Sequence, residues 1–157
     1  MDPRAVEDVV ALVGYKIYKG KKLLNVGSEE MFRAIVKELP YNIYEHRNDT
    51  TSLPKGKFDV IVCSDVIESS VRWRNDVNKL LVRMTKGGSL IVVTPNIVLW
   101  RIARLLSFRS YDKNHLNNIT PVILTKNVIM MKPLTVERVL KLPFSWLPLT
   151  YVTVFKA

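Results

Sequence analysis

The sequence has one cysteine, Cys63, and two histidines among its 157 residues. A single thiol cannot close an internal disulfide, and Cys63 lies in a run of valines and isoleucines where a small buried side chain fits. Neither histidine is spaced with other ligand types as zinc and other metal sites require. These shortages predict a protein without a structural metal, and we expect it in the cytoplasm.

Long apolar runs are also absent. No stretch approaches the roughly 18 uninterrupted apolar residues of a membrane span, and the opening MDPRAVEDVV carries early acids where a signal peptide has an apolar core. The composition, 48% hydrophobic and 24% charged, is ordinary for a globular protein. The length suits one domain that buries about 70% of its unfolded surface. We expect a single domain over residues 1–157 and no membrane partner.

Acidic residues are few beside the basic ones. The chain has 14 Asp and Glu against 24 Lys and Arg, a net charge of +10 at pH 7. Such a field attracts polyanions or acidic surfaces. The segment NIVLWRIARLLSFRSY, residues 96–111, mixes arginines with aromatic side chains, as surfaces that contact phosphates and bases do. A nucleic acid and an acidic protein are candidate partners; an amphipathic helix on a solvated basic surface is the alternative.

A glycine-rich phosphate loop is missing as well. The stretch KKLLNVGSEEMF, residues 21–32, runs from a buried-strand pattern into one glycine and then two carboxylates. A phosphate would require more glycines and a positive local field. The two acids fit the first turn of a helix, where each interacts with the helix dipole by about 0.3 to 1 kcal/mol.

The spacing of apolar residues predicts an α/β protein. Helices are expected over residues 3–18, 28–39 and 76–84, and strands over 22–26, 41–46, 58–63 and 89–93. Later we expect a helix over 100–106, a polar loop over 110–121, and strands over 127–131 and 151–156 on either side of 135–142. The alternation implies βαβ units and a doubly wound parallel sheet. Ligands then bind beyond the carboxyl ends of the strands.

Two stretches resemble a known family. FDVIVCSDVIES, residues 58–69, followed by KLLVRMTKGGSLIVVTPN, residues 79–96, resembles the fourth and fifth strands of class I S-adenosylmethionine-dependent methyltransferases. KKLLNVG stands where that family has its first strand and motif I, and HLNNITP, residues 115–121, resembles its His-x-x-x-x-(Ser/Thr)-Pro stretch. The resemblance implies a three-layer Rossmann-like methyltransferase fold, a mostly parallel central sheet, and S-adenosylmethionine as cofactor.

The resemblance also assigns residues to the methionine end of the cofactor. Asn25, Gly27 and Ser28 fall at motif I, where the backbone packs against the ligand. Asn25 replaces a common aspartate, and Ser28 begins the stretch that replaces the rest of a Gly-x-Gly run, so motif I is degenerate. Glu29 or Glu30 could face the ammonium of the cofactor; the alternative is that both belong only to the first helical turn.

The family places one acid at the end of its second strand for the ribose hydroxyls and another after its third strand near the adenine. Glu45, 18 residues after Gly27, and Asp49, four residues before Leu53, match these positions. Only three residues separate the two acids, so we predict that the edge third strand and its helix are missing. The alternative is that the second strand is lost. Two carboxylate oxygens suit a vicinal diol, although Glu45 also fits a solvated strand end.

On the acceptor side, Asp65 is the first candidate to contact the substrate and His115 the second. Ser64, which ends the central strand, is assigned to the cofactor. Asp65 could instead cap the turn that follows it. Ser69 stands where the family often has histidine, and His46 is expected at the surface.

These features predict methyl transfer from S-adenosylmethionine to an unidentified acceptor, a macromolecule or a small metabolite. The alternatives are an inactive methyltransferase-like scaffold and a basic nucleic-acid-binding protein. A homodimer is a candidate assembly, because a trimmed sheet exposes an edge and Trp146 with residues 147–149 forms a short apolar stretch.

Overall fold

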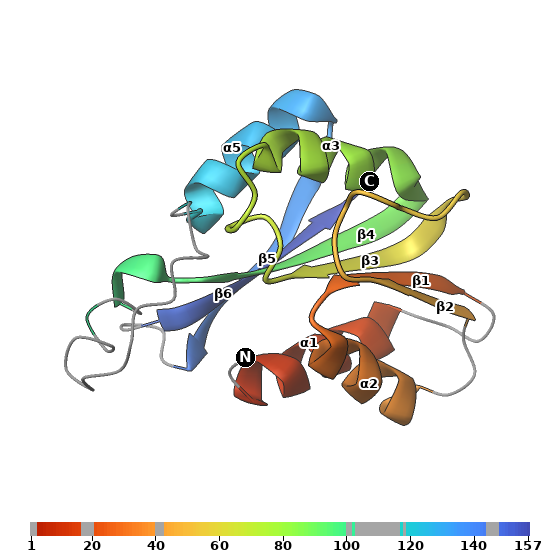
Figure 1. Cartoon of the computed structure of the whole chain (residues 1–157), viewed down its shortest axis with the longest axis horizontal. Helices are drawn as coiled ribbons and strands as arrows, with labels where there is room; N and C mark the ends of the chain where they lie inside the picture. The colour runs from red at the N-terminus through yellow and green to blue at the C-terminus, as the bar shows by residue number, and fades with distance from the viewer. Residues whose placement is uncertain are drawn as a thin grey trace.

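The computed structural model describes residues 3–16, 21–39, 43–99, 102, 117, 119–143 and 148–157. Within them a six-stranded sheet runs in the order β2-β1-β3-β4-β6-β5 (Figure 1). The strands are β1 (Lys22–Gly27), β2 (Ile43–Arg47), β3 (Phe58–Ser64), β4 (Met84–Pro95), β5 (Thr135–Pro143) and β6 (Pro148–Lys156). The first four are parallel, and β6 runs antiparallel to both β4 and β5. The predicted α/β fold with a mostly parallel sheet is confirmed.

Helices cover both faces of this sheet (Figure 1). Helices α1 (Pro3–Lys16) and α2 (Glu29–Glu38) lie on one face, and α3 (Trp73–Arg83) and α5 (Pro121–Met131) on the other. Each face has its own apolar core, and neighbouring residues of β1 divide between them: Leu23 packs with α1 and α2, Leu24 with α3 and α5. Burial on both faces explains why β3 and residues 90–93 of β4 are nearly continuous apolar runs in the sequence. No described helix is long and apolar enough to cross a bilayer.

Among the described residues, the third strand that was predicted to be missing from the edge of the sheet is absent. Strand β2 pairs directly with β1, with Asn25 opposite His46, and it forms one edge of the sheet. Residues 48–57, all of them described, link β2 to β3 without a helix or a strand, and Leu53 packs against the core on the α3 face. Since the strand beside β1 is kept, the alternative loss of the second strand is wrong.

One prediction in the last third is wrong, and one strand was not predicted. Residues 127–131, predicted as a strand, belong to α5. Residues 135–142, for which no element was predicted, form most of β5. Helix α5 is apolar on nearly all sides, so its apolar residues do not show the helical spacing of an amphipathic helix. The sequence does contain an N-cap for it, because the Thr120 hydroxyl accepts a hydrogen bond from the Ile123 amide. The strand predicted over 151–156 is confirmed as β6. Residues 100–101 and 103–116, with most of the predicted basic helix and loop, lie outside the described residues.

Candidate functional site

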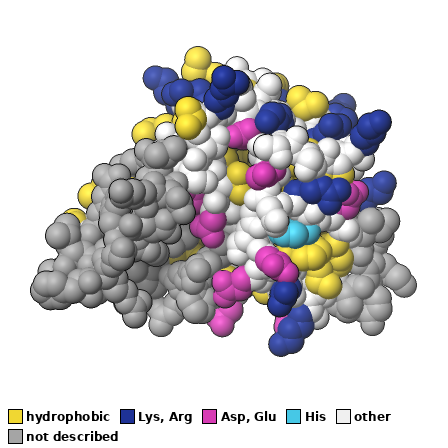
Figure 2. Space-filling model, viewed as in Figure 1, with side chains coloured by type: hydrophobic (Ala, Val, Ile, Leu, Met, Phe, Trp, Pro, Cys, Tyr) yellow, Lys and Arg dark blue, Asp and Glu magenta, His cyan; other side chains and the backbone are white. Residues whose placement is uncertain are grey.

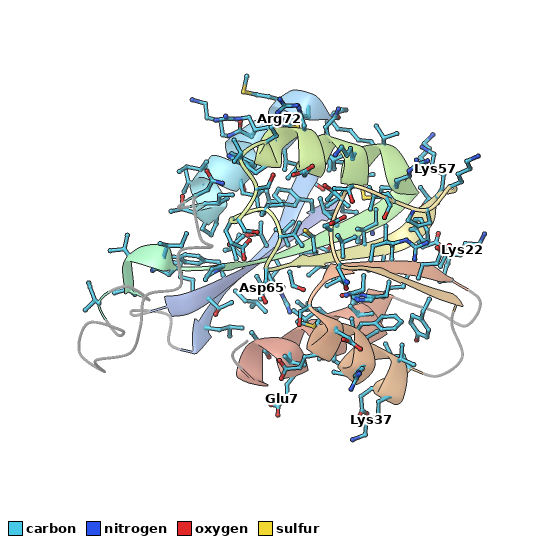
Figure 3. The ribbon with its side chains drawn as sticks, viewed as in Figure 1. Glu7, Lys22, Lys37, Lys57, Asp65 and Arg72 are labelled. Atoms are coloured by element: carbon cyan, nitrogen blue, oxygen red, sulfur yellow. The ribbon has the colours of Figure 1, made fainter. Side chains whose placement is uncertain are left out.

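The carboxyl ends of β1, β2, β3 and β4 meet at one edge of the sheet. The segments that follow them, residues 28–32, 48–54, 65–71 and 96–99, are called the carboxyl edge below. Figure 3 shows Asp65 at this edge near the middle of the molecule, with Lys22 and Lys57 at the opposite end of the strands. Acidic side chains gather in the middle of the face shown in Figure 2, and Lys and Arg lie mainly toward its rim.

At Gly27 the end of β1 lies in close contact with the end of β3. It has a φ of 106°, and a Cβ there would lie 1.8 Å from the carbonyl oxygen of Ser64 and 2.7 Å from a Val66 methyl carbon. Only glycine fits this position. The Ser28 amide donates to the Ser64 hydroxyl at 3.2 Å, so the fold brings together Gly27, Ser28 and Ser64, three of the residues predicted for the cofactor.

Ser28 also begins the next helix. Its hydroxyl accepts from the Met31 amide at 3.2 Å as the N-cap of α2. Glu29 lies in the first turn and pairs with Arg33 at 2.7 Å. The stretch that replaces the family's Gly-x-Gly run is therefore an ordinary capped helix start.

Asn25 is buried beneath the contact between the ends of β1 and β3. Its Nδ2 donates to the Ser28 carbonyl at 3.1 Å and to His46 Nδ1 at 3.0 Å, and His46 Nε2 donates to Asn48 Oδ1 at 3.1 Å. The His46 ring stacks on Phe32, with centroids 4.8 Å apart. His46 is thus half-buried in a network, not the surface residue that was predicted. Asn25 Oδ1 is buried with no hydrogen bond from any described residue.

The two acids predicted for the ribose and adenine lie farther along β2 and its loop. Glu45 is opposite Leu24, on the α3 face, with 36% of its side chain exposed and Arg47 at 3.4 Å. Asp49 Oδ1 accepts from the Thr51 hydroxyl at 2.6 Å and the Thr51 amide at 2.8 Å, and these bonds lower the pKa of Asp49. Asp49 lines a groove of about 480 Å³ beside residues 66–72. Their cofactor contacts remain predictions.

Asp76, which sequence reasoning missed, forms hydrogen bonds with three other residues that line this groove. Its carboxylate accepts from the hydroxyls of Thr50 and Ser70 and, at 3.0 Å, from the Lys79 ammonium. Burial alone would raise the pKa of Asp76, but the bonds from Ser70, Thr50 and Lys79 lower it below its usual value. Asp76 thereby ties the loop after β2 and the turn after β3 to α3. In the sequence it was visible only as an acid near a helix start.

Asp65 and Glu68 occupy the turn after β3. Asp65 is exposed with a left-handed φ of 59°, whereas Glu68 is 1% exposed and neither of its carboxyl oxygens receives a well-formed hydrogen bond from a described residue. Burial and then the nearby negative charge of Asp65 raise the pKa of Glu68 to about 8. Glu68 was a second omission of the sequence predictions, because nothing in its spacing showed that it is buried.

Hydrogen bonds from Asn117 hold the turn after β3 in place. Asn117 donates from its backbone amide to the Glu68 carbonyl at 2.9 Å and from Nδ2 to the Ser70 carbonyl at 2.7 Å. The Ser69 hydroxyl bonds within the turn, to the Val66 carbonyl at 2.9 Å. His115, the second acceptor-side prediction, lies outside the described residues, as do Trp146 and Leu147.

No protein-family model and no curated protein matches this sequence. Solved structures do match. The small RNA methyltransferase HEN1 superposes with a TM-score of 0.77 at 13% identity, over 99% of this chain and 25% of that one. Magnesium protoporphyrin IX methyltransferase from Synechocystis PCC 6803, with bound SAH, gives 0.65 at 14% identity over 98% and 82% of the chains. The plantazolicin methyltransferase BpumL, in complex with SAH, gives 0.65 at 11% identity over 96% and 82%. The chain therefore has the Rossmann-like fold of class I methyltransferases.

Proposed function

We propose that this protein transfers a methyl group from S-adenosylmethionine to an acceptor. The observation that carries the proposal is the close contact at the carboxyl edge, where Gly27 leaves no room for a Cβ against Ser64 and the buried Asn25 Oδ1 receives no hydrogen bond from a described residue. An orphaned buried acceptor beside a close backbone approach suits a ligand with an ammonium group. The shared fold of solved methyltransferases supports the same function.

The charge of the carboxyl edge also fits this cofactor, which carries an ammonium and a sulfonium. The four segments contain five acids and no Lys or Arg, although the whole chain has a net charge of +10. The acids are Glu29, Glu30, Asp49, Asp65 and Glu68. Opposite charges nearby stabilise both ionised groups, so these acids suit a cationic ligand.

Each residue of the site has a distinct role in the proposal. Asn25 Oδ1 accepts a hydrogen bond from the ammonium, and Gly27 and Ser28 form the backbone surface beside it. Glu45 binds the ribose hydroxyls and Asp49 the adenine end. The bound cofactor supplies a methyl group already activated by positive sulfur. The chain's own residues then align the acceptor with that carbon and exclude water, which can lower the barrier by several kcal/mol.

One observation favours the alternative of an inactive scaffold. Ser28 caps α2 and Glu29 pairs with Arg33, so the residues that replace the glycine run already have partners within the helix. If they leave no room for the methionine end, the fold persists without the cofactor. The third alternative, nucleic-acid binding, rests on the basic segment 101–109, most of which lies outside the described residues.

Isothermal titration with S-adenosylmethionine and with S-adenosylhomocysteine tests the proposal. We expect binding, and Glu45→Ala should weaken it about tenfold or more through loss of charged hydrogen bonds of roughly 1.5 to 3 kcal/mol. The matched control is Glu38→Gln, because Glu38 is exposed at the far end of α2. Absence of heat and of any thermal shift at millimolar ligand would refute cofactor binding. Unchanged affinity in Glu45→Ala would refute only the ribose assignment.

A further inference from the structure

Two hydrogen-bond acceptors fix the orientation of the Asn25 side-chain amide. Its Nδ2 donates one hydrogen bond to the Ser28 carbonyl at 3.1 Å and the other to His46 Nδ1 at 3.0 Å. A carbonyl oxygen only accepts, so the nitrogen of the amide and not its oxygen must face Ser28. Asn25 Oδ1 therefore lies on the other side of the amide, buried and without a hydrogen bond from any described residue.

The same bonds determine which nitrogen of His46 carries a proton. Because Asn25 Nδ2 can only donate, His46 Nδ1 accepts, and a neutral imidazole then carries its proton on Nε2. Nε2 lies 3.1 Å from Asn48 Oδ1, which accepts a hydrogen bond from it. The tautomer that satisfies Asn25 therefore also satisfies Asn48.

The His46 ring is held in place by the helix that covers it. It stacks on Phe32 of α2, with the centroids 4.8 Å apart and 19° between the planes. The Phe32 amide donates to the Ser28 carbonyl at 3.2 Å, and this is the oxygen that also accepts from Asn25. Residues of β1, β2 and α2 thus fix the position of a single amide.

We propose that His46 is a positioning residue for the cofactor. By accepting from Asn25 Nδ2, it keeps Asn25 Oδ1 directed at the ammonium of S-adenosylmethionine. The inference rests on the proposed methyltransferase function and deepens it. A reversed amide would present Nδ2 to the ammonium, donor against donor, so the orientation decides whether the contact attracts or repels. Without His46 Nδ1, one buried N–H of Asn25 loses its acceptor, and the amide turns to satisfy it.

A role in packing alone would not require this pattern of donors and acceptors. Stacking on Phe32 needs only a flat ring, which phenylalanine also supplies. The Nδ1 acceptor matters only because Asn25 donates to it. The ring and the acceptor can therefore be separated by substitution at position 46.

Calorimetric titration of the full chain with two ligands separates these roles. S-adenosylhomocysteine carries the ammonium, and 5′-methylthioadenosine is a related nucleoside without the amino-acid part. His46→Phe keeps a ring on Phe32 but has no Nδ1. It should weaken S-adenosylhomocysteine binding about tenfold and 5′-methylthioadenosine binding by less than about twofold.

Two further variants accompany this measurement. In His46→Asn a side-chain oxygen is bonded to Cγ, as Nδ1 is in histidine, so it should restore S-adenosylhomocysteine binding to within about threefold of the wild type. Glu38→Gln, at an exposed site on α2, is the matched control and should bind both ligands as the wild type does.

A double-mutant cycle tests whether His46 acts through Asn25. Asn25→Ala removes Oδ1 and should by itself weaken S-adenosylhomocysteine binding about tenfold. Adding His46→Phe should then weaken binding by less than about twofold more, since no amide remains to be oriented. Thermal unfolding of each variant verifies that it is folded before the affinities are compared.

Nitrogen-15 NMR of the imidazole rings tests the tautomer without any ligand. The chain has two histidines, and His46→Phe identifies the signals of His46. The neutral His46 ring of the wild type should carry its proton on Nε2. Asn25→Asp replaces the donating nitrogen by an acceptor, so in that variant His46 Nδ1 should carry a proton.

Three results would overturn the inference. They are equal weakening of both ligands in His46→Phe, additive effects of Asn25→Ala and His46→Phe, and a proton on Nδ1 of the neutral wild-type ring. Wild-type binding of S-adenosylhomocysteine is the separate test of the proposed function. Its absence refutes that function, whereas binding that does not depend on His46 refutes the positioning role alone.

Discussion

Replacing Glu68 by glutamine should change how the stability of this protein depends on pH. Burial and the charge of Asp65 raise the pKa of Glu68 from 4.5 to about 8. Each pKa unit corresponds to about 1.4 kcal/mol, so ionising Glu68 in the folded protein is about 5 kcal/mol less favourable than in the unfolded chain. Because the side chain is only 1% exposed, solvent screening does not reduce this value much.

The sign follows from the protons that each state binds. Between pH 4.5 and pH 8 the unfolded chain ionises Glu68 while the folded protein keeps it protonated, so the folded state binds more protons. The free energy of unfolding therefore falls as pH rises through this window and levels off above it. For Glu68 the expected loss between pH 5 and pH 8 is about 3 to 4 kcal/mol.

Urea unfolding followed by circular dichroism at pH 5, 6, 7, 8 and 9 measures this effect. Relative to the wild type, Glu68→Gln should be close in stability at pH 5 and more stable by about 3 to 4 kcal/mol at pH 8. Glu38→Gln, at an exposed site, should follow the wild-type profile. If Glu68→Gln shows the same slope between pH 5 and pH 8 as the wild type, Glu68 ionises normally, and our account of its buried environment is wrong.

Two further substitutions test the packing around the site. Gly27→Ala should destabilise the protein by about 3 kcal/mol or more, because its Cβ would lie 1.8 Å from the Ser64 carbonyl oxygen at a φ of 106°; a thermal midpoint within 2 °C of the wild type would contradict this contact. Asp76→Asn should lower stability at pH 7 by about 1 to 3 kcal/mol, because the charged acceptor of Thr50, Ser70 and Lys79 is lost. The pKa of Asp76 is lowered, so its contribution is present above the unfolded pKa of 3.8 and is lost as pH falls below that value; acid titration of unfolding should show the loss in the wild type and not in the variant.

The sequence pattern sufficed for the centre of the sheet. Strand β3 and the second half of β4, residues 90–94, are rich in buried β-branched residues, and such runs mark parallel strands covered on both faces. The short interval between Glu45 and Asp49 correctly predicted the missing edge unit, because three residues cannot form a helix and a strand. Gly27, Ser28 and Ser64 were expected to lie close together because the carboxyl ends of parallel strands lie at one edge of the sheet, and the Ser28 amide does donate to the Ser64 hydroxyl.

Local pattern failed where the period of apolar residues carries little information. Helix α5 is apolar on most sides, with Val122 and Met130 exposed, so residues 127–131 look as much like a strand as a helix. Strand β5 is at the edge of the sheet and carries Glu137, Arg138 and Lys141, which gives it a polar pattern unlike a buried strand.

The chemistry of the site was decided by tertiary structure. In the sequence, Glu68 and Asp65 are simply two acids of a motif-like turn, and Asp76 is an acid near a helix start. Only the folded chain buries Glu68 beside Asp65, and only there does Asp76 accept hydrogen bonds from Thr50 and Ser70. The physical reason is that hydrophobic period is set by neighbours along the chain, whereas the ionisation and hydrogen bonding of a carboxyl depend on groups that folding brings to it.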